Sequence, residues 1–239
     1  MEKILFRSSS AGDLLAEPKL KADKEAGKLS ETAKSLVTKV WLNNQFGYSE
    51  DVLTDEMLKG ILCEQEAMGL VQKVLKGEFR VAYKKNLSND YVTGTPDIVL
   101  QKEDYVEDIK SSFNLRTFVD AEPNRLYETQ AQCYMELTGK KHFRLIYCLV
   151  KTPESIITSQ KTKWFYKFNC DSENEDYIKV AMQIDHNNNL IDKLPPERRI
   201  KVFEFHHDKE YIARLYDKID KAREFYKTLD LPNANTISR

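Results

Sequence analysis

The chain has 239 residues, of which 31% are charged and 41% are hydrophobic, and its formal net charge at pH 7 is −1. This length allows one or two domains, and no stretch approaches the roughly twenty apolar residues that a membrane-spanning helix needs. The nearly neutral balance excludes a global basic field for nucleic acid, although a local basic groove can coexist with an acidic remainder.

Two features bear on the compartment and on metal binding. The segment 1–7 has too short an apolar run for a secretory signal, which predicts a cytoplasmic protein. The cysteines lack a paired C-x-x-C spacing, which argues against a zinc knuckle and an iron–sulfur cluster. We expect buried, reduced thiols at all four positions: Cys63, Cys133, Cys148 and Cys170.

The first thirty residues are polar and are expected to be partly irregular. The serines at 8–10 predict a turn that caps a helix beginning at Asp13. Ser30 is the expected cap of a helix that runs to Leu42, and a polar bend over 43–49 follows. Its predicted buried stripe consists of Ala33, Leu36, Val37, Val40 and Trp41.

Apolar residues recur at helical spacing from Leu58 to Leu75 and predict one helix. Gly60, Glu64 and Ala67 fall on one side of it, at intervals of four and three. Glu66 points well away from Glu64.

Residues 94–110 contain the most informative pattern. A turn ending in Asp97 precedes a short apolar strand at 98–100, and a polar hairpin leads to a second strand. The two-residue period of a strand places Asp108 and Lys110 on one face and turns Glu107 to the other.

Two carboxylates and a lysine in this arrangement are typical of a metal-dependent phosphodiesterase. Carboxylates can hold a divalent ion that polarises a phosphate and lowers the pKa of a bound water, and Mg²⁺ suits such a site. Lys110 would orient the attacking water or stabilise charge on the phosphate. Taken alone, an Asp-x-Lys triplet is common by chance, and an exposed surface strand is the alternative explanation.

The second half of the chain is predicted to alternate between helices and strands. A helix over 124–137 carries Gln130 and Tyr134 one turn apart, and a buried central strand covers Phe143–Val150. Further strands are expected at Lys161–Phe168 and Ile200–Phe205. Asp208 should cap a last helix through Tyr226 that buries Ile212, Leu215, Ile219, Ala222 and Phe225.

Other catalytic arrangements are not indicated. His206 and His207 precede the capping Asp208 and need no chemical role, and His142 and His186 are isolated. The sequence contains no Ser-His-Asp arrangement, no G-x-x-x-x-G-K-[ST] loop and no glycine-rich dinucleotide fingerprint. An ATP-driven activity is therefore not expected in this chain.

Four motifs occur in order: Gly60-x-x-x-Glu64-x-x-Ala67, Gly94-Thr95-Pro96-Asp97, Asp108-Ile109-Lys110 and Gln130-x-x-x-Tyr134. With them the chain resembles the PD-(D/E)xK nuclease superfamily, and within it the exonucleases of the YqaJ-type viral recombinase and lambda-exonuclease group. The resemblance implies an α/β, restriction-endonuclease-like core with a mixed central sheet flanked by helices. We expect one nuclease domain over 1–239, with its core at about 55–150, a helical region at 1–50 and an elaboration at 151–239.

The resemblance also implies roles for single residues. Asp97, Asp108 and the carbonyl of Ile109 would ligate the metal, with Glu64 near it. Lys110 would be catalytic, and Gln130 and Tyr134 are characteristic of such DNA-end-processing enzymes. Glutamate is commoner than aspartate at the position of Asp108; Glu107 would replace it only if the strand were bulged there.

Contacts to DNA are predicted from the same resemblance and from local positive charge. A serine-bearing segment near the amino terminus suggests Arg7 and Ser9 as phosphate contacts. Arg116 and Arg125 are further candidates, as are Lys73, Lys76, Arg80, Lys84 and Lys85. The alternative for each is a solvated surface charge.

The implied activity is exonuclease digestion of linear double-stranded DNA with Mg²⁺ or Mn²⁺, in phage-type recombination in the cytoplasm of a bacterial host. Such enzymes often form homo-oligomeric rings and pass the exposed strand to a single-strand annealing protein. The alternatives are an endonuclease or repair nuclease acting on branched or modified DNA, or a catalytically inactive DNA-binding module. The joint presence of Glu64, Asp97, Asp108 and Lys110 speaks against the inactive module.

Overall fold

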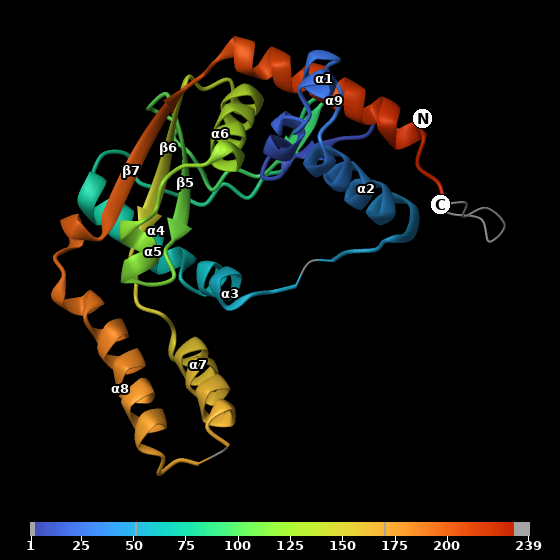
Figure 1. The fold of residues 1–239 in the computed structure, drawn as a ribbon. Coiled ribbons are helices and arrows are strands. Elements are labelled where there is room, and N and C mark those ends of the chain that lie inside the picture. The colour runs from blue at the N-terminus through green and yellow to red at the C-terminus, as the bar shows by residue number, and fades with distance from the viewer. Residues whose placement is uncertain (1–2, 51, 170, 232–239) are drawn as a thin grey trace.

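A four-stranded mixed sheet lies at the centre of the computed structural model, which describes residues 3–50, 52–169 and 171–231. β5 (Tyr105–Ser111) and β6 (His142–Cys148) are parallel, and the two edge strands run antiparallel to their neighbours. The α/β fold with a mixed sheet flanked by helices is therefore confirmed (Figure 1). In sheet order the strands are β4 (Ile98–Val99), β5 (Tyr105–Ser111), β6 (His142–Cys148) and β7 (Ile200–His206).

The sheet is covered on both faces, by α4 (Glu64–Leu75) and α6 (Arg125–Thr138). Phe143 and Leu145 of β6 pack in the same core as residues of α6, whereas Ile146 of β6 packs in the core that includes residues of α4. A strand covered on both faces is apolar along its whole length, which explains the run of residues that predicted β6.

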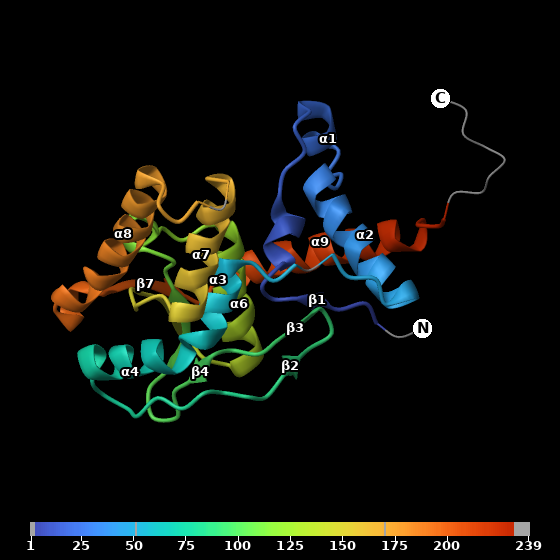
Figure 2. The same ribbon diagram turned by 90° about the horizontal axis from the view of Figure 1, so that it is seen from below.

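Segments from the first and last parts of the described chain meet in a second core. A small sheet in the order β1-β3-β2 consists of Phe6–Arg7, Val92–Gly94 and Leu87–Ser88. It packs with α2 (Glu31–Phe46) and α9 (Lys209–Lys227), which lie together away from the central sheet (Figures 1 and 2). Ser30 caps α2 and Asp208 caps α9, as predicted. α2 continues past Leu42 and ends where Gly47 adopts a left-handed conformation.

The predicted strand at Lys161–Phe168 is wrong, because these residues belong to a helical hairpin. Its helices are α7 (Glu154–Lys167) and α8 (Glu175–Asn189), and it projects from the body of the molecule (Figure 1). Trp164 and Phe168 stack one helical turn apart, with ring centroids 6.0 Å from each other, and Phe165 packs on Tyr177 at 5.5 Å. Packing between two helices here overrides the strand preference of aromatic residues.

Two helix predictions also need correction. The single helix expected from Leu58 to Leu75 is two helices, α3 (Asp55–Leu62) and α4, joined at Cys63. The helix expected from Asp13 is only a 3-10 turn, η1 (Ala11–Leu15), and the Ser10 hydroxyl donates to the Arg7 carbonyl instead of capping a helix. Gly12 packs so closely on α6 that a Cβ there would lie 2.9 Å from Thr129 Oγ1, so η1 is placed by tertiary contact.

The remaining elements are short, and no helix in the described ranges is both long and apolar enough to span a membrane. They are α1 (Lys21–Glu25), α5 (Leu115–Val119), η2 (Ile191–Lys193) and η3 (Pro196–Arg198).

Candidate active site

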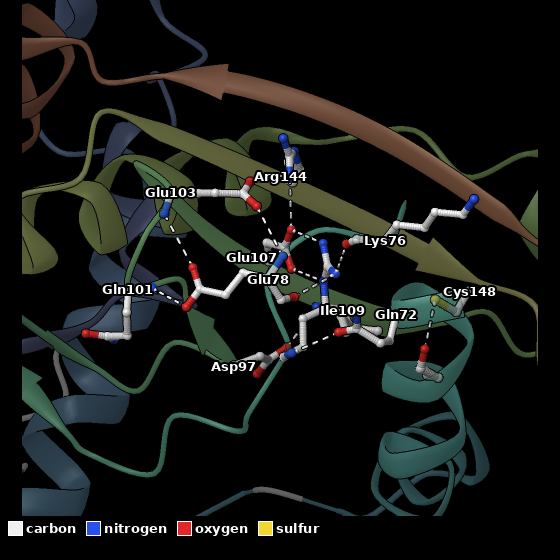
Figure 3. A network of polar contacts seen from close by, with 12 residues as sticks. Gln72, Lys76, Glu78, Asp97, Gln101, Glu103, Glu107, Ile109, Arg144 and Cys148 are labelled. Carbon is white, nitrogen blue, oxygen red and sulfur yellow. Dashed lines mark hydrogen bonds and ion pairs between the residues drawn. The ribbon is translucent and has the colours of Figure 1, made fainter. Parts of the chain in front are cut away.

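The register between β4 and β5 brings two carboxylates together. Ile98 lies opposite Glu107, so the next pair in this register is Asp97 and Asp108. Side chains directly opposite each other on antiparallel strands have Cβ atoms about 5 Å apart. Asp97 Oδ2 also accepts a hydrogen bond of 2.8 Å from the backbone N–H of Ile109, which orients its carboxylate (Figure 3).

Lys110 joins this pair from the same face of β5. Its Nζ lies 2.6 Å from Asp108 Oδ2, and Asp108 is only 1% exposed. Desolvation acts to lower the pKa of Lys110, but the Asp108 and Asp97 carboxylates outweigh it and raise the pKa above its ordinary value. Lys110 is therefore a permanent cation in this site.

Among the described residues, Lys110 is the one basic side chain that forms an ion pair with Asp97 or Asp108. Asp108 Oδ2 receives no well-aligned hydrogen bond from the described residues, although Lys110 lies beside it as an ion-pair partner. Burial, followed by the charges of Asp108 and Glu64, raises the pKa of Asp97 to about 7, against the opposing effects of Lys110 and the Ile109 N–H. A cation would relieve both effects, and Mg²⁺ needs only one or two carboxylates because it keeps several waters. The donor set therefore fits a hard divalent ion.

Glu64 stands at the edge of the site. It is the first residue of α4 and is exposed. Its charge contributes to the raised pKa of Asp97, but no three Asp, Glu, His or Cys side chains in the described part of the chain form a ready metal-binding cluster. The close carboxylate pair thus consists of Asp97 and Asp108.

Gln130 and Tyr134 of α6 connect the two carboxylate-bearing segments. Gln130 Nε2 lies 3.4 Å from Asp108 Oδ1 and donates to the Tyr134 hydroxyl at 3.1 Å. The Tyr134 hydroxyl in turn donates to the Thr95 carbonyl at 3.1 Å. Burial raises the pKa of Tyr134 to about 12, so its hydroxyl remains a donor. Gln130 and Tyr134 lie one turn apart on the same face of α6, as predicted. From this face they contact Asp108 and the turn before Asp97.

Gly94 allows the amino-terminal segment to approach this turn. A Cβ at Gly94 would lie 2.7 Å from Tyr134 Cε1 and 2.8 Å from Ser8 Oγ. Ser8 is buried and bonds to the Thr93 carbonyl through both its N–H and its hydroxyl. Its neighbours Arg7 and Ser9 are exposed and line a groove of about 740 Å³ beside α2.

Glu107 points to the opposite face of β5, so the strand has no bulge that would place it in the site. It is fully buried, with Arg80 Nε at 2.6 Å. Arg144 Nη1 lies 3.1 Å from its carboxylate on the other side (Figure 3). The suggestion that Arg80 lines a DNA groove is therefore wrong, because its guanidinium is buried against Glu107. Arg144 is the other partner of Glu107, and it is recognisable in the sequence as a charged residue within the apolar run of β6.

The other predicted basic contacts lie on the surface. Arg116 pairs with Asp120, and Arg125 donates to the Gly12 carbonyl at 2.9 Å while remaining partly exposed. Lys73, Lys76, Lys84 and Lys85 are exposed. Of the predicted thiols, Cys63, Cys133 and Cys148 are buried and free, and Cys170 lies outside the described residues.

Solved structures resemble this chain, although no protein-family model and no curated protein matches it. A phage-related exonuclease from Haemophilus somnus 129PT is 25% identical, with a TM-score of 0.75 over 94% of both chains. An alkaline exonuclease from Laribacter hongkongensis is 13% identical, with a TM-score of 0.59 over 94% of this chain and 89% of the other. At that identity the second likeness supports the fold alone.

Proposed function

We propose that this chain, which shares the fold of PD-(D/E)xK exonucleases such as the phage-related enzyme, is a metal-dependent nuclease that degrades linear double-stranded DNA from its ends. The observation that supports the proposal is the meeting of Asp97, Asp108 and Lys110 at one edge of the central sheet. Two carboxylates and a permanent cation are the groups that phosphodiester hydrolysis needs.

In this proposal Asp97 and Asp108 hold Mg²⁺ or Mn²⁺, with Glu64 and the Ile109 carbonyl as further ligands. The bound ion would polarise the scissile phosphate and lower the pKa of a coordinated water. Lys110, whose pKa is raised, would orient the water or stabilise charge on the phosphate, because a permanent ammonium is a poor general base. Gln130 and Tyr134 keep Asp108 and the Asp97 turn in place.

The DNA contacts belong to the same proposal. Arg7, Ser9, Arg116 and Arg125 would bind phosphates, which carry no sequence information. The phage-related exonuclease that this chain resembles supports a nuclease of phage type. The proposal includes a role in phage-type recombination in a bacterial cytoplasm. A homo-oligomeric ring and a single-strand annealing partner complete the proposal.

The test is cleavage of one plasmid, supplied linear and supercoiled, with Mg²⁺ or with EDTA. We expect Mg²⁺-dependent loss of the linear form alone, and a fall of at least a hundredfold in Lys110→Ala, because a charge-stabilising group is typically worth 10²–10³ in rate. Lys34→Ala, which removes a partly exposed lysine paired with Glu31, serves as the control.

Attack on both plasmid forms would replace the exonuclease with an endonuclease. DNA binding without cleavage under any condition would favour the inactive module. Wild-type activity in Lys110→Ala would show that the site is wrongly assigned.

A further inference from the structure

Lys59 is a buried lysine outside the carboxylate pair. It lies in α3 and is 0% exposed. Its Nζ donates to the Phe113 carbonyl at 3.0 Å and to the Val150 carbonyl at 2.7 Å. None of the ion pairs within the described ranges includes Lys59, so main-chain oxygens take the place of a carboxylate partner.

This arrangement is unfavourable unless the ammonium is well hydrogen-bonded, because burial removes it from water. Burial lowers the pKa of Lys59 to about 8, while the nearby Cys63 and Glu66 act in the opposite direction. An apolar side chain of similar length would fill the same space without this penalty. The two hydrogen bonds are therefore the specific contribution of a lysine at this position.

The two carbonyls mark the ends of the central parallel strands. Phe113 follows the last residue of β5 by two positions, and β5 carries Asp108 and Lys110. Val150 follows the last residue of β6 by two positions. Lys59 thus ties α3 to the strand end that immediately follows the catalytic candidates.

The turn that begins at Lys59 leads directly to Glu64. The Lys59 carbonyl accepts a hydrogen bond of 2.9 Å from the Cys63 N–H. The buried Cys63 thiol contacts the Lys151 carbonyl at 3.5 Å. Both ends of this turn are therefore attached to the end of the sheet, and Glu64 is the next residue.

We infer that Lys59 is a positioning residue for Glu64: its two hydrogen bonds hold the α3–α4 junction, and with it Glu64, against the end of the strand that carries Asp108 and Lys110. This inference rests on the proposed function. Lys59 itself touches neither substrate nor metal.

The experiment compares wild type, Lys59→Met, Glu64→Gln and the double variant. The readouts are the Mg²⁺ concentration for half-maximal cleavage, kcat and KM for linear DNA, and the thermal unfolding temperature. We expect Lys59→Met to raise the Mg²⁺ requirement ten- to a hundredfold, the usual effect of losing an outer support of a metal site. It should leave KM for linear DNA nearly unchanged. In the double variant it should raise the Mg²⁺ requirement little beyond that of Glu64→Gln, because both changes remove the same contribution of Glu64 to metal binding.

Two further variants separate positioning from general damage. Lys140→Met removes another lysine-to-carbonyl bond, from Lys140 Nζ to Glu103 O at 2.9 Å, and should keep the wild-type Mg²⁺ requirement. Lys59→Arg, which retains donors, should recover part of the loss. If Lys59→Met does not fold, the same cycle is run with Lys59→Gln, whose amide retains a donor.

Independent, multiplicative effects of the Lys59 and Glu64 changes would overturn the inference, as would an unchanged Mg²⁺ requirement in a folded Lys59 variant. Absence of Mg²⁺-dependent cleavage in the wild type would instead overturn the proposed function.

Discussion

Asp97 carries a proton over a pH range in which an ordinary aspartate does not. Burial and the neighbouring Asp108 raise its pKa from 3.8 to about 7. Between these values the folded chain binds more protons than the unfolded chain. The stability that this group contributes to the metal-free protein is therefore present below about pH 4 and is lost as the pH rises through about 7.

Metal binding should show the reverse dependence on pH. An ion at Asp97 and Asp108 must displace the proton that the pair holds below pH 7, so the affinity for Mg²⁺ should fall by up to tenfold per pH unit as the pH drops from 7 to 6. Calorimetric titration with Mg²⁺ between pH 6 and 8 measures this. Asp97→Asn, which cannot titrate, should bind weakly and with little dependence on pH, and a flat wild-type profile would contradict the assignment.

Strand alternation predicted the orientation of single residues within β5. Asp108 and Lys110 share a face and Glu107 takes the other, as the two-residue period requires. The partner of Glu107 was not predictable, because Arg80 lies 27 positions away in a segment without regular secondary structure. Predicting DNA contacts from positive charge near the site was therefore wrong for Arg80, which is buried against Glu107.

At the scale of elements, Gly94 sets how closely β1, β3 and α6 approach each other. Gly94→Ala should cost about 1–3 kcal/mol of unfolding free energy, the range for a side chain forced into a packed site, because its Cβ would meet Tyr134 and Ser8. It should also lower nuclease activity, since the same contacts hold the turn before Asp97.

Gly69→Ala is the matched control for Gly94→Ala. No described atom lies within 4 Å of a Cβ at this α4 position, so alanine should stabilise the helix by about 0.5–1 kcal/mol. Urea denaturation of both variants measures the difference. Equal stability of the two variants would show that Gly94 is not tightly packed.

The predictions of element type and bounds were wrong where contacts between residues far apart in the sequence decide them. A continuous apolar pattern predicted one helix through Leu58 and Leu75, yet α3 is attached to the strand ends by Lys59 while α4 lies along the sheet face. The strand expected at Lys161–Phe168 failed for a similar reason, because α7 packs on α8, a helix that was not predicted although Asn174 caps it.

At the scale of the whole molecule, the core that joins the chain ends also supports the site. Leu215 of α9 is fully buried in it with Phe6 of β1, next to Ser8 and the Gly94 turn. Leu215→Ala should lower the free energy of unfolding by about 2–5 kcal/mol. Leu20→Ala, at a position 67% exposed, should change it by less than about 0.5 kcal/mol. Thermal and urea denaturation of the two variants measure this, and equal losses would show that α9 is not part of a packed core.

The sequence by itself determined the central strands, the helix carrying Gln130 and Tyr134, and the shared face of Asp108 and Lys110. These depend on periodicity and capping, which act over a few residues. Only the tertiary structure decided that Asp97 lies opposite Asp108, that Arg80 neutralises Glu107, and that Lys59 holds the turn before Glu64. Such contacts join residues far apart in the chain, and their energies depend on burial, which no local pattern specifies.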